Sequence, residues 1–146
     1  MFALPQEVRN LIHTIEKAGF EAYVVGGSVR DMLMEQKPHD WDVATNARPE
    51  QVMQLFEETV PTGLRHGTVT VFQNGYAAEM TTYRTESAYV DHRAPQQVQF
   101  VQNIAEDLKR RDFTINAMAF HPQRGIVDLF GGKEDLKQGI IRAVGE

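Results

Sequence analysis

The sequence predicts an α/β (α+β) fold in which a small mixed sheet has helices packed against it, and three observations support this prediction. The chain has 146 residues, of which 42% are hydrophobic, and this suits one core of ordinary size. Segments with helical spacing of apolar residues alternate with short apolar strands. The sequence contains no internal repeat and no low-complexity segment. We therefore expect one globular domain.

The first part of the chain predicts two helices and a strand. Leu4–Ala18 is expected to form an amphipathic helix because its apolar residues recur at helical spacing, and Pro5 suits a first turn. A strand is expected at Ala22–Val25. The residues Gly26-Gly27-Ser28 then separate it from a short helix over Val29–Met34.

The middle of the chain predicts a second strand, a second amphipathic helix and a hairpin. The strand covers about Asp40–Ala44, and the helix covers Pro49–Glu57. The hairpin pairs Thr68–Phe72 with Ala77–Tyr83. Residues 73–76 contain an Asn-Gly pair, which supplies the positive φ angles of a tight turn.

The last part of the chain is expected to begin with a polar loop, Arg84–Gln97, because this stretch has no steady period. The elements predicted after it are a strand at Val98–Val101, helices at Ile104–Arg111 and Thr114–Ala119, a hairpin around Gly125, a break at Gly131-Gly132 and a strand at Ile140–Val144. The chain stops at residue 146 without a closing helix. We therefore expect it to be a portion of something longer.

Composition and charge exclude several classes of protein. The absence of cysteine excludes disulfides and thiolate metal sites. No apolar run approaches the ~20 residues that cross a bilayer, and the N-terminus does not resemble a signal peptide, so we expect a cytoplasmic protein with no membrane partner. The formal net charge of −5 argues against coating of nucleic acid by bulk attraction, although basic residues cluster at Lys109-Arg110-Arg111.

Two aspartates, Asp40 and Asp42, flank a tryptophan in the stretch KPHDWDVAT. Side chains at positions i and i+2 of a strand share a face, about 7 Å apart, so the two carboxylates could converge on one ion. Like charges held together are costly unless a cation neutralises them, and Mg²⁺ accepts one or two protein carboxylates together with substrate phosphates. The alternative is an edge strand with solvated acids, since this motif alone is weak.

The glycine turn changes the balance between these alternatives. Gly26-Gly27-Ser28 ends a strand and opens a helix, where unpaired N–H groups favour an anion, and Arg30 adds a donor fork for phosphate. The pattern matches neither G-x-x-x-x-G-K-[ST] nor G-x-G-x-x-G. A Gly-Gly pair alone is more often a tight turn. A phosphate cradle about a dozen residues before a carboxylate pair nevertheless describes a nucleoside triphosphate site.

Five stretches together resemble a known family: YVVGGSVRD, HDWDVAT, EMTTYRTE, DLKRRDFTINAMA and DLFGGKEDL. They are similar to the head domain of the class II CCA-adding enzymes, which are tRNA nucleotidyltransferases of the polymerase β-like superfamily. Bacterial poly(A) polymerases share this head. The resemblance runs from about Tyr23 to the end. It implies that residues 1–146 form a catalytic head, and that the family's helical neck, body and tail domains are absent from this chain.

The resemblance also implies roles for individual residues. The predicted metal ligands are Asp40 and Asp42, the predicted third carboxylate is Glu79, and the predicted nucleotide-binding residues are Gly26, Gly27, Arg30, Arg111 and Asn116. Other readings stay open: Glu79 could be a solvated strand acid, and Asn116 could cap or bond the backbone. Asp31 is interpreted as structural, for instance paired with a nearby arginine. The five histidines show no ligand spacing, although His39 and His66 are candidates for lining the cleft.

The implied function is Mg²⁺-dependent, template-independent addition of C and A nucleotides from CTP and ATP to the tRNA 3′ end, with release of pyrophosphate. The loop at 84–95 resembles a flexible loop of enzymes that add the terminal A. Base selection and most tRNA binding in the family lie beyond the head, so we expect the chain alone to bind triphosphate weakly and tRNA more weakly.

Three alternatives remain. One is a poly(A) polymerase, and another is a nucleotidyltransferase acting on a small molecule or a protein hydroxyl. The third is a non-enzymatic interaction module. A degenerate module would have lost the carboxylate pair or Arg30, and this sequence keeps both.

Overall fold

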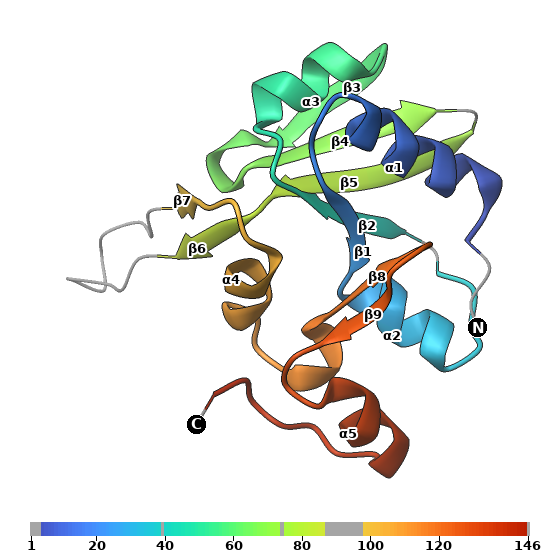
Figure 1. The fold of residues 1–146 in the computed structure, drawn as a ribbon, viewed down its shortest axis with the longest axis vertical. Helices are drawn as coiled ribbons and strands as arrows, with labels where there is room; N and C mark the ends of the chain where they lie inside the picture. Colours follow the sequence, from blue (N-terminus) through green and yellow to red (C-terminus); the bar gives the residue numbers. More distant parts are fainter. Residues whose placement is uncertain (1–3, 39, 74, 87–97, 146) are drawn as a thin grey trace.

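The computed structural model describes residues 4–38, 40–73, 75–86 and 98–145 (Figure 1). Its helices are α1 (Gln6–Lys17), α2 (Gly27–Leu33), α3 (Pro49–Leu55), α4 (Ile104–Lys109) and α5 (Gly132–Gln138), with short 3-10 turns η1 (Leu64–His66) and η2 (Thr114–Asn116). Its strands are β1 (Ala22–Val25), β2 (Trp41–Thr45), β3 (Glu58–Gly63), β4 (Thr68–Gln73), β5 (Tyr76–Thr82), β6 (Arg84–Glu86), β7 (Val98–Phe100), β8 (Met118–His121) and β9 (Gly125–Asp128). No helix in these ranges is long and apolar enough to cross a membrane.

Seven of the strands form one mixed sheet in the order β3-β4-β5-β2-β1-β8-β9. The central pair, β2 and β5, is parallel, and every other pair of neighbours in the sheet is antiparallel. Strands β6 and β7 form a separate antiparallel ribbon. The structure thus confirms the predicted mixed sheet with helices packed against it, and it confirms the hairpins at 73–76 and at Gly125.

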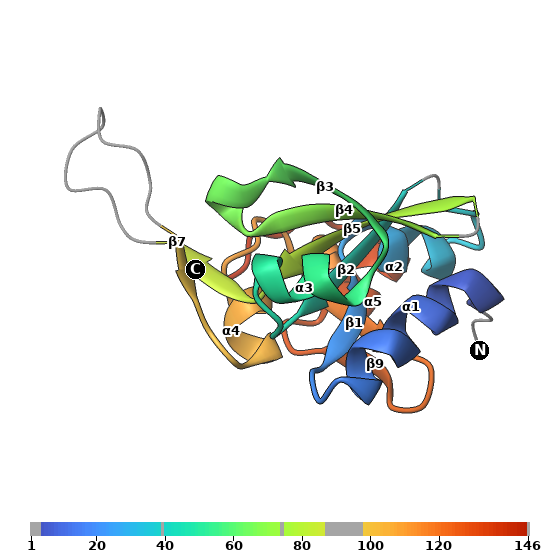
Figure 2. The ribbon, with the colours of Figure 1, turned by 90° about the horizontal axis from the view of Figure 1, so that it is seen from above.

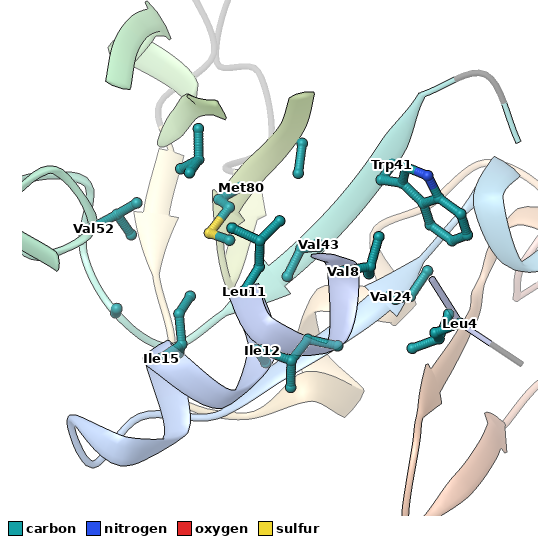
Figure 3. Packing of buried hydrophobic residues seen from close by; sticks show 14 of the residues in the cluster. Leu4, Val8, Leu11, Ile12, Ile15, Val24, Trp41, Val43, Val52 and Met80 are labelled. Atoms are coloured by element: carbon teal, nitrogen blue, oxygen red, sulfur yellow. The ribbon is translucent and has the colours of Figure 1, made fainter. Parts of the chain in front are cut away.

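The main core lies between the sheet and the helices α1 and α3, which lie on the same side of the sheet (Figure 2). Leu11 and Ile15 of α1 belong to the same buried cluster as Val43 of β2 and Met80 of β5 (Figure 3). Burying an aliphatic side chain of this size stabilises the fold by about 1.5–3 kcal/mol. The helical spacing of the apolar residues in α1 therefore has its physical explanation in this contact with the sheet.

The opposite face of the sheet carries a smaller buried cluster, which includes Ala44 of β2 and Leu108 of α4. Side chains alternate along a strand. On β2, Trp41 and Val43 join the main core, so Asp42 and Ala44 belong to the opposite face. The carboxylate of Asp42 thus emerges on the side of the sheet where α4 packs.

Two predicted elements are wrong. The helix expected at Thr114–Ala119 is a 3-10 turn followed by β8, in which Ala119 pairs with Val25 and Phe120 with Val24. Alanine and methionine favour helices locally, but pairing beside a central strand overrides this preference. The strand expected at Ile140–Val144 is also absent, and only Ala143 forms an isolated bridge, with Phe113.

Other elements differ from the prediction in extent. Arg84–Glu86, expected as loop, forms β6, whereas residues 87–97 lie outside the described residues. Helix α2 starts two residues earlier than expected, at Gly27. Neither β3 nor α5 was predicted from the pattern.

Helix α5 begins at the second glycine of the expected Gly131-Gly132 break. The carboxylate of Asp128 accepts hydrogen bonds from the backbone N–H groups of Gly132 and Lys133, at 2.7 and 3.0 Å, so an acid shortly before the helix caps it. A Cβ at Gly132 would collide with the backbone carbonyl of Thr114. The glycine therefore permits close packing of α5 on η2.

Candidate functional site

The turn after β1 forms the floor of the candidate site. Gly26 has φ +65°, a conformation that glycine adopts without strain. A Cβ on Gly26 would lie 3.2 Å from Nη1 of Arg111 and 3.9 Å from Oδ2 of Asp42. The missing side chain therefore lets a guanidinium and a carboxylate approach the same point of the backbone. At Gly27, a Cβ would lie 3.2 Å from Nη2 of Arg30.

Ser28 connects this turn to the aspartates. Its hydroxyl donates to the backbone carbonyl of Asp40 at 3.0 Å and accepts from the backbone N–H of Asp42 at 3.0 Å. Asp40 lies in a bend one residue before β2, and its side chain is exposed. The expectation that both aspartates belong to the strand is therefore wrong for Asp40, whose position is set by the hydrogen bond to Ser28. Only Asp42 belongs to β2.

Glu79 lies opposite Asp42 on the parallel strand β5. The two residues share a face of the sheet, and the side chain of Glu79 is exposed. Burial, followed by the charge of Glu79, raises the pKa of Asp42 to about 6; Arg111 acts in the lowering direction, and Asp40 contributes a smaller increase. The site is thus a cluster of three carboxylates, those of Asp40, Asp42 and Glu79, whose negative charges repel one another. Arg111 neutralises this charge only in part.

The residues present fit Mg²⁺ as a two-carboxylate site. Within the described residues, no group of three or more His, Asp or Glu side chains is arranged to hold a metal ion. Asp40 and Asp42 are close enough in space for the charge of Asp40 to raise the pKa of Asp42. Carboxylate oxygens are hard ligands, and Mg²⁺ is commonly held by one or two of them, with substrate phosphates completing its coordination.

Arg30 and Asn116 contact each other across the turn. Nη1 of Arg30 donates to Oδ1 of Asn116 at 2.9 Å, which brings together two predicted nucleotide-binding residues that are 86 positions apart. Arg30 also pairs with Asp31 at 3.4 Å, as expected for a structural Asp31. The Asn116 side chain therefore orients an arginine instead of capping the helix nearby.

Arg111 is mostly buried, with 16% of its side chain exposed. Nη2 donates to Oδ2 of Asp107 at 3.1 Å, while Nε has no hydrogen-bond partner among the described residues. Burial lowers the pKa of Arg111, and the charge of Asp107 opposes this shift. A buried guanidinium that has an unused donor, Nε, and reaches Gly26 through Nη1 is suited to an anionic ligand.

Asp107, whose side chain is fully buried, was not predicted from the sequence. It precedes Arg110 and Arg111 by three and four residues on a predicted helix, and acid–arginine pairs at these spacings are neighbours on a helix surface. This spacing was the available signal. Of the two histidines considered for the cleft, His66 is exposed, and its carbonyl accepts a hydrogen bond from Arg84 at 3.0 Å, whereas His39 lies outside the described residues.

A family model and a curated relative both match most of this chain. A family model described as the poly A polymerase head domain matches residues 22–142. The CCA-adding enzyme of Lactobacillus helveticus is 60% identical over 136 residues, which cover 93% of this chain and 34% of that protein.

Two solved structures show the same relationship. The crystal structure of the Bacillus stearothermophilus CCA-adding enzyme in complex with CTP has a TM-score of 0.86 and 45% identity, covering 97% of this chain and 33% of the other. The Thermotoga maritima CCA-adding enzyme complexed with a tRNA has a TM-score of 0.70 and 29% identity, covering 94% and 32%. The chain spans about a third of the length of these relatives.

Proposed function

The chain belongs to the poly A polymerase head domain family, and from this membership we propose that it is the catalytic head of a CCA-adding tRNA nucleotidyltransferase. One observation carries the proposal: a carboxylate, Asp42, and a buried guanidinium, Arg111, meet at the side-chain-free Gly26. Relatives and solved structures named as CCA-adding enzymes support it. The substrates we propose are CTP, ATP and the tRNA 3′ end.

The reaction follows from where charge develops. The 3′-hydroxyl oxygen of the tRNA loses its proton to solvent and forms a bond to the α-phosphorus, the bond to the bridging oxygen breaks, and pyrophosphate leaves with the electron pair. Arg111, Arg30 and the N–H groups of the turn at Gly26-Gly27 would align the triphosphate and stabilise the charge on the leaving group. Asn116 would keep Arg30 in position through its 2.9 Å hydrogen bond.

Asp40 and Asp42 would hold the metal. Bound Mg²⁺ would activate the attacking hydroxyl and neutralise charge on the phosphates. Ser28 would keep the two aspartates together, because its hydroxyl bonds the backbone of both. Glu79, which faces Asp42 from β5, would act as the predicted third carboxylate through its charge, since it raises the pKa of Asp42.

Binding tests the site directly. We expect calorimetric titration of ATP and CTP in the presence of Mg²⁺ to give metal-dependent binding to the wild-type chain. The double variant Asp40→Ala/Asp42→Ala should stay folded and lose this binding. Equal binding by both proteins would refute the assignment of the two aspartates. Similar affinities for ATP and CTP would fit a head without a base-selecting element.

The reaction itself separates the proposal from poly(A) addition, which the family's description makes the second candidate. We propose that this chain, fused to the part of the Lactobacillus helveticus relative that lies beyond the match and given a tRNA without its terminal CCA together with CTP and ATP, yields products that end in CCA on sequencing. A run of A residues would favour the poly(A) reading. Deleting residues 87–95 from the same fusion, which keeps β6 and its bond to Asp107, should spare CTP addition and impair ATP addition, and equal loss of both would argue against the proposed role of the segment at 84–95.

A further inference from the structure

The buried carboxylate of Asp107 on α4 contacts three donors. Oδ2 accepts from Nη2 of Arg111 at 3.1 Å. Oδ1 accepts from the backbone N–H of Arg84 at 3.0 Å and from Nε of Arg110 at 3.3 Å. Both oxygens of a carboxylate that solvent does not reach are therefore used, and they join α4, the candidate site and the first residue of β6.

Charge balance explains only part of this arrangement. A buried carboxylate is costly unless it is paired, and the guanidinium groups of Arg110 and Arg111, each mostly buried, satisfy that requirement. Pairing with arginine does not require the backbone amide of Arg84. That third bond ties a segment outside the seven-stranded sheet to the carboxylate that holds Arg111.

The bond to Asp107 restricts the orientation of the Arg111 guanidinium. Because this group is planar and is attached to the side chain through Cδ, holding Nη2 limits the positions of Nη1 and Nε as well. Nη1 is the atom that lies beside Gly26, and Nε is the donor without a partner among the described residues. Without Asp107, the side chain would have to find other partners for Nη2 and would lose this orientation.

The base of the β6–β7 ribbon is also well packed. The backbone N–H of Val101 donates to the carbonyl of Tyr83 at 2.9 Å. A Cβ on Gly67 would lie 2.7 Å from the ring of Phe100, so this ring packs directly on the backbone before β4. A displacement of Arg84 would therefore also disturb the contacts of the β6–β7 ribbon with Tyr83 and Gly67.

We propose that Asp107 is a positioning residue, whose carboxylate orients Arg111 for the leaving pyrophosphate group and couples that orientation to the start of the β6–β7 ribbon. This inference rests on the proposed function for its ligand. Asp107 itself touches neither substrate nor metal in this assignment. The coupling is reciprocal: a ligand that engages Arg111 changes the environment of the Arg84 amide.

The first test needs no ligand. Nuclear magnetic resonance relaxation of the Arg111 Nε–Hε group reports how well the guanidinium is ordered. We expect an order parameter close to that of rigid backbone, about 0.85, in the wild-type chain and a value below about 0.6 in Asp107→Asn. The matched control is Glu16→Gln, which removes the charge of a carboxylate that is paired with His121 at 2.6 Å. This variant should leave Arg111 ordered. Unchanged order in Asp107→Asn would overturn the proposal.

The second test uses inorganic pyrophosphate with Mg²⁺ as the probe. We expect Asp107→Asn to bind it about tenfold more weakly than the wild-type chain, and the Arg84 amide resonance to shift on titration only in the wild type. Glu16→Gln should match the wild type in both. A wild-type affinity in Asp107→Asn, or an Arg84 shift that persists in this variant, would contradict the proposed positioning or coupling.

The two tests keep this inference distinct from the proposed function. If the wild-type chain does not bind pyrophosphate, the assigned triphosphate site is refuted, while the order of Arg111 still decides whether Asp107 positions it. If Asp107→Asn does not fold, Asp107→Glu takes its place, since it keeps the charge but moves the carboxylate by one methylene. That variant should bind pyrophosphate roughly threefold more weakly, and an undiminished affinity would count against the proposal.

Discussion

Asp42 and Glu79 lie opposite each other on the two parallel strands at the centre of the sheet, so that two acids share one face. This arrangement works against the stability of the chain without metal, because burial and the charge of Glu79 raise the pKa of Asp42 to about 6. Sites that bind charged ligands commonly carry such a cost. The relationship predicts how the stability of the metal-free chain depends on pH.

Replacing Asp42 should stabilise the metal-free chain above pH 6. The pKa of Asp42 rises from 3.8 when unfolded to about 6 when folded. Its stabilising contribution is therefore fully present below pH 3.8 and is lost as pH rises through about 6. Asp42→Asn avoids this loss, so we expect its free energy of unfolding to exceed that of wild type by on the order of 1 kcal/mol at pH 7 to 8.

Urea denaturation at a series of pH values measures this difference. The advantage of Asp42→Asn should grow between pH 4 and 6 and then stay constant. Glu57→Gln, an exposed acid between α3 and β3, serves as the control and should show no comparable change. A variant less stable than wild type at pH 8 would contradict the electrostatic account.

Adding a methyl group at Gly26 should remove nucleotide binding. The new Cβ would require φ +65° and would stand 3.2 Å from Nη1 of Arg111 and 3.9 Å from Oδ2 of Asp42. Gly125 is a matched control, because it has φ +81° with no atom within 4 Å of the added Cβ. Both alanine variants should lose about 1–2 kcal/mol of stability from the backbone conformation, measured by thermal unfolding.

Calorimetry with ATP and Mg²⁺ then separates the two glycine variants. Gly125→Ala should bind like wild type, and Gly26→Ala should show no binding. Binding by Gly26→Ala at wild-type affinity would mean that the approach of Arg111 and Asp42 at this turn is not used for the ligand.

The sequence predicted those parts of the fold that local pattern determines. Helix α1 and the hairpin at 73–76 follow from apolar spacing and from the turn residues. The prediction of a helix at Thr114–Ala119 was wrong because β8 forms by pairing with β1, about 95 positions earlier in the chain, and the local sequence does not show this partner. Helix α5 was missed because Gly131-Gly132 was interpreted as a break, whereas Gly132 is the first helical residue and Asp128, four residues earlier, caps the helix.

The candidate site divides in the same way. Asp42, Gly26 and Arg111 were identified from motifs, and the structure brings all three together. Asp107 was not, because an acid in a charged run gives no sign of burial; its role depends on contacts with Arg84 and Arg111 that only the fold creates. Residues that hold other residues in place are thus harder to predict than residues that carry a motif.

Removing the hydroxyl of Ser28 should weaken metal binding as well as the fold. Ser28 bonds the backbone of both Asp40 and Asp42, so Ser28→Ala frees the bend that presents the aspartates. We expect a loss of about 1 kcal/mol in stability and roughly a fivefold loss in affinity for ATP with Mg²⁺. Thr14→Ala, which loses a 3.0 Å bond to the carbonyl of Asn10 on α1, should lower stability alone. Equal affinities in the two variants would show that Ser28 is only a structural residue.

The role of Glu79 can be decided by removing its charge while keeping its shape. The side chain is exposed, and it forms no three-residue metal group within the described part of the chain. Glu79→Gln should therefore lower the pKa of Asp42 and stabilise the metal-free chain above pH 6, by less than Asp42→Asn does, because burial is the larger cause of the raised pKa.

The same variant should keep most of its metal binding if Glu79 acts through charge and is not a ligand. We expect Mg²⁺ affinity, followed through the amide resonances of β2 and β5, to fall roughly threefold in Glu79→Gln and to disappear in Asp42→Asn. Losing one neighbouring charge weakens attraction for a cation, whereas losing a ligand removes a bond to it. A complete loss of Mg²⁺ binding in Glu79→Gln would instead make Glu79 a third ligand, and its side chain would then have to turn toward Asp42 when the metal binds.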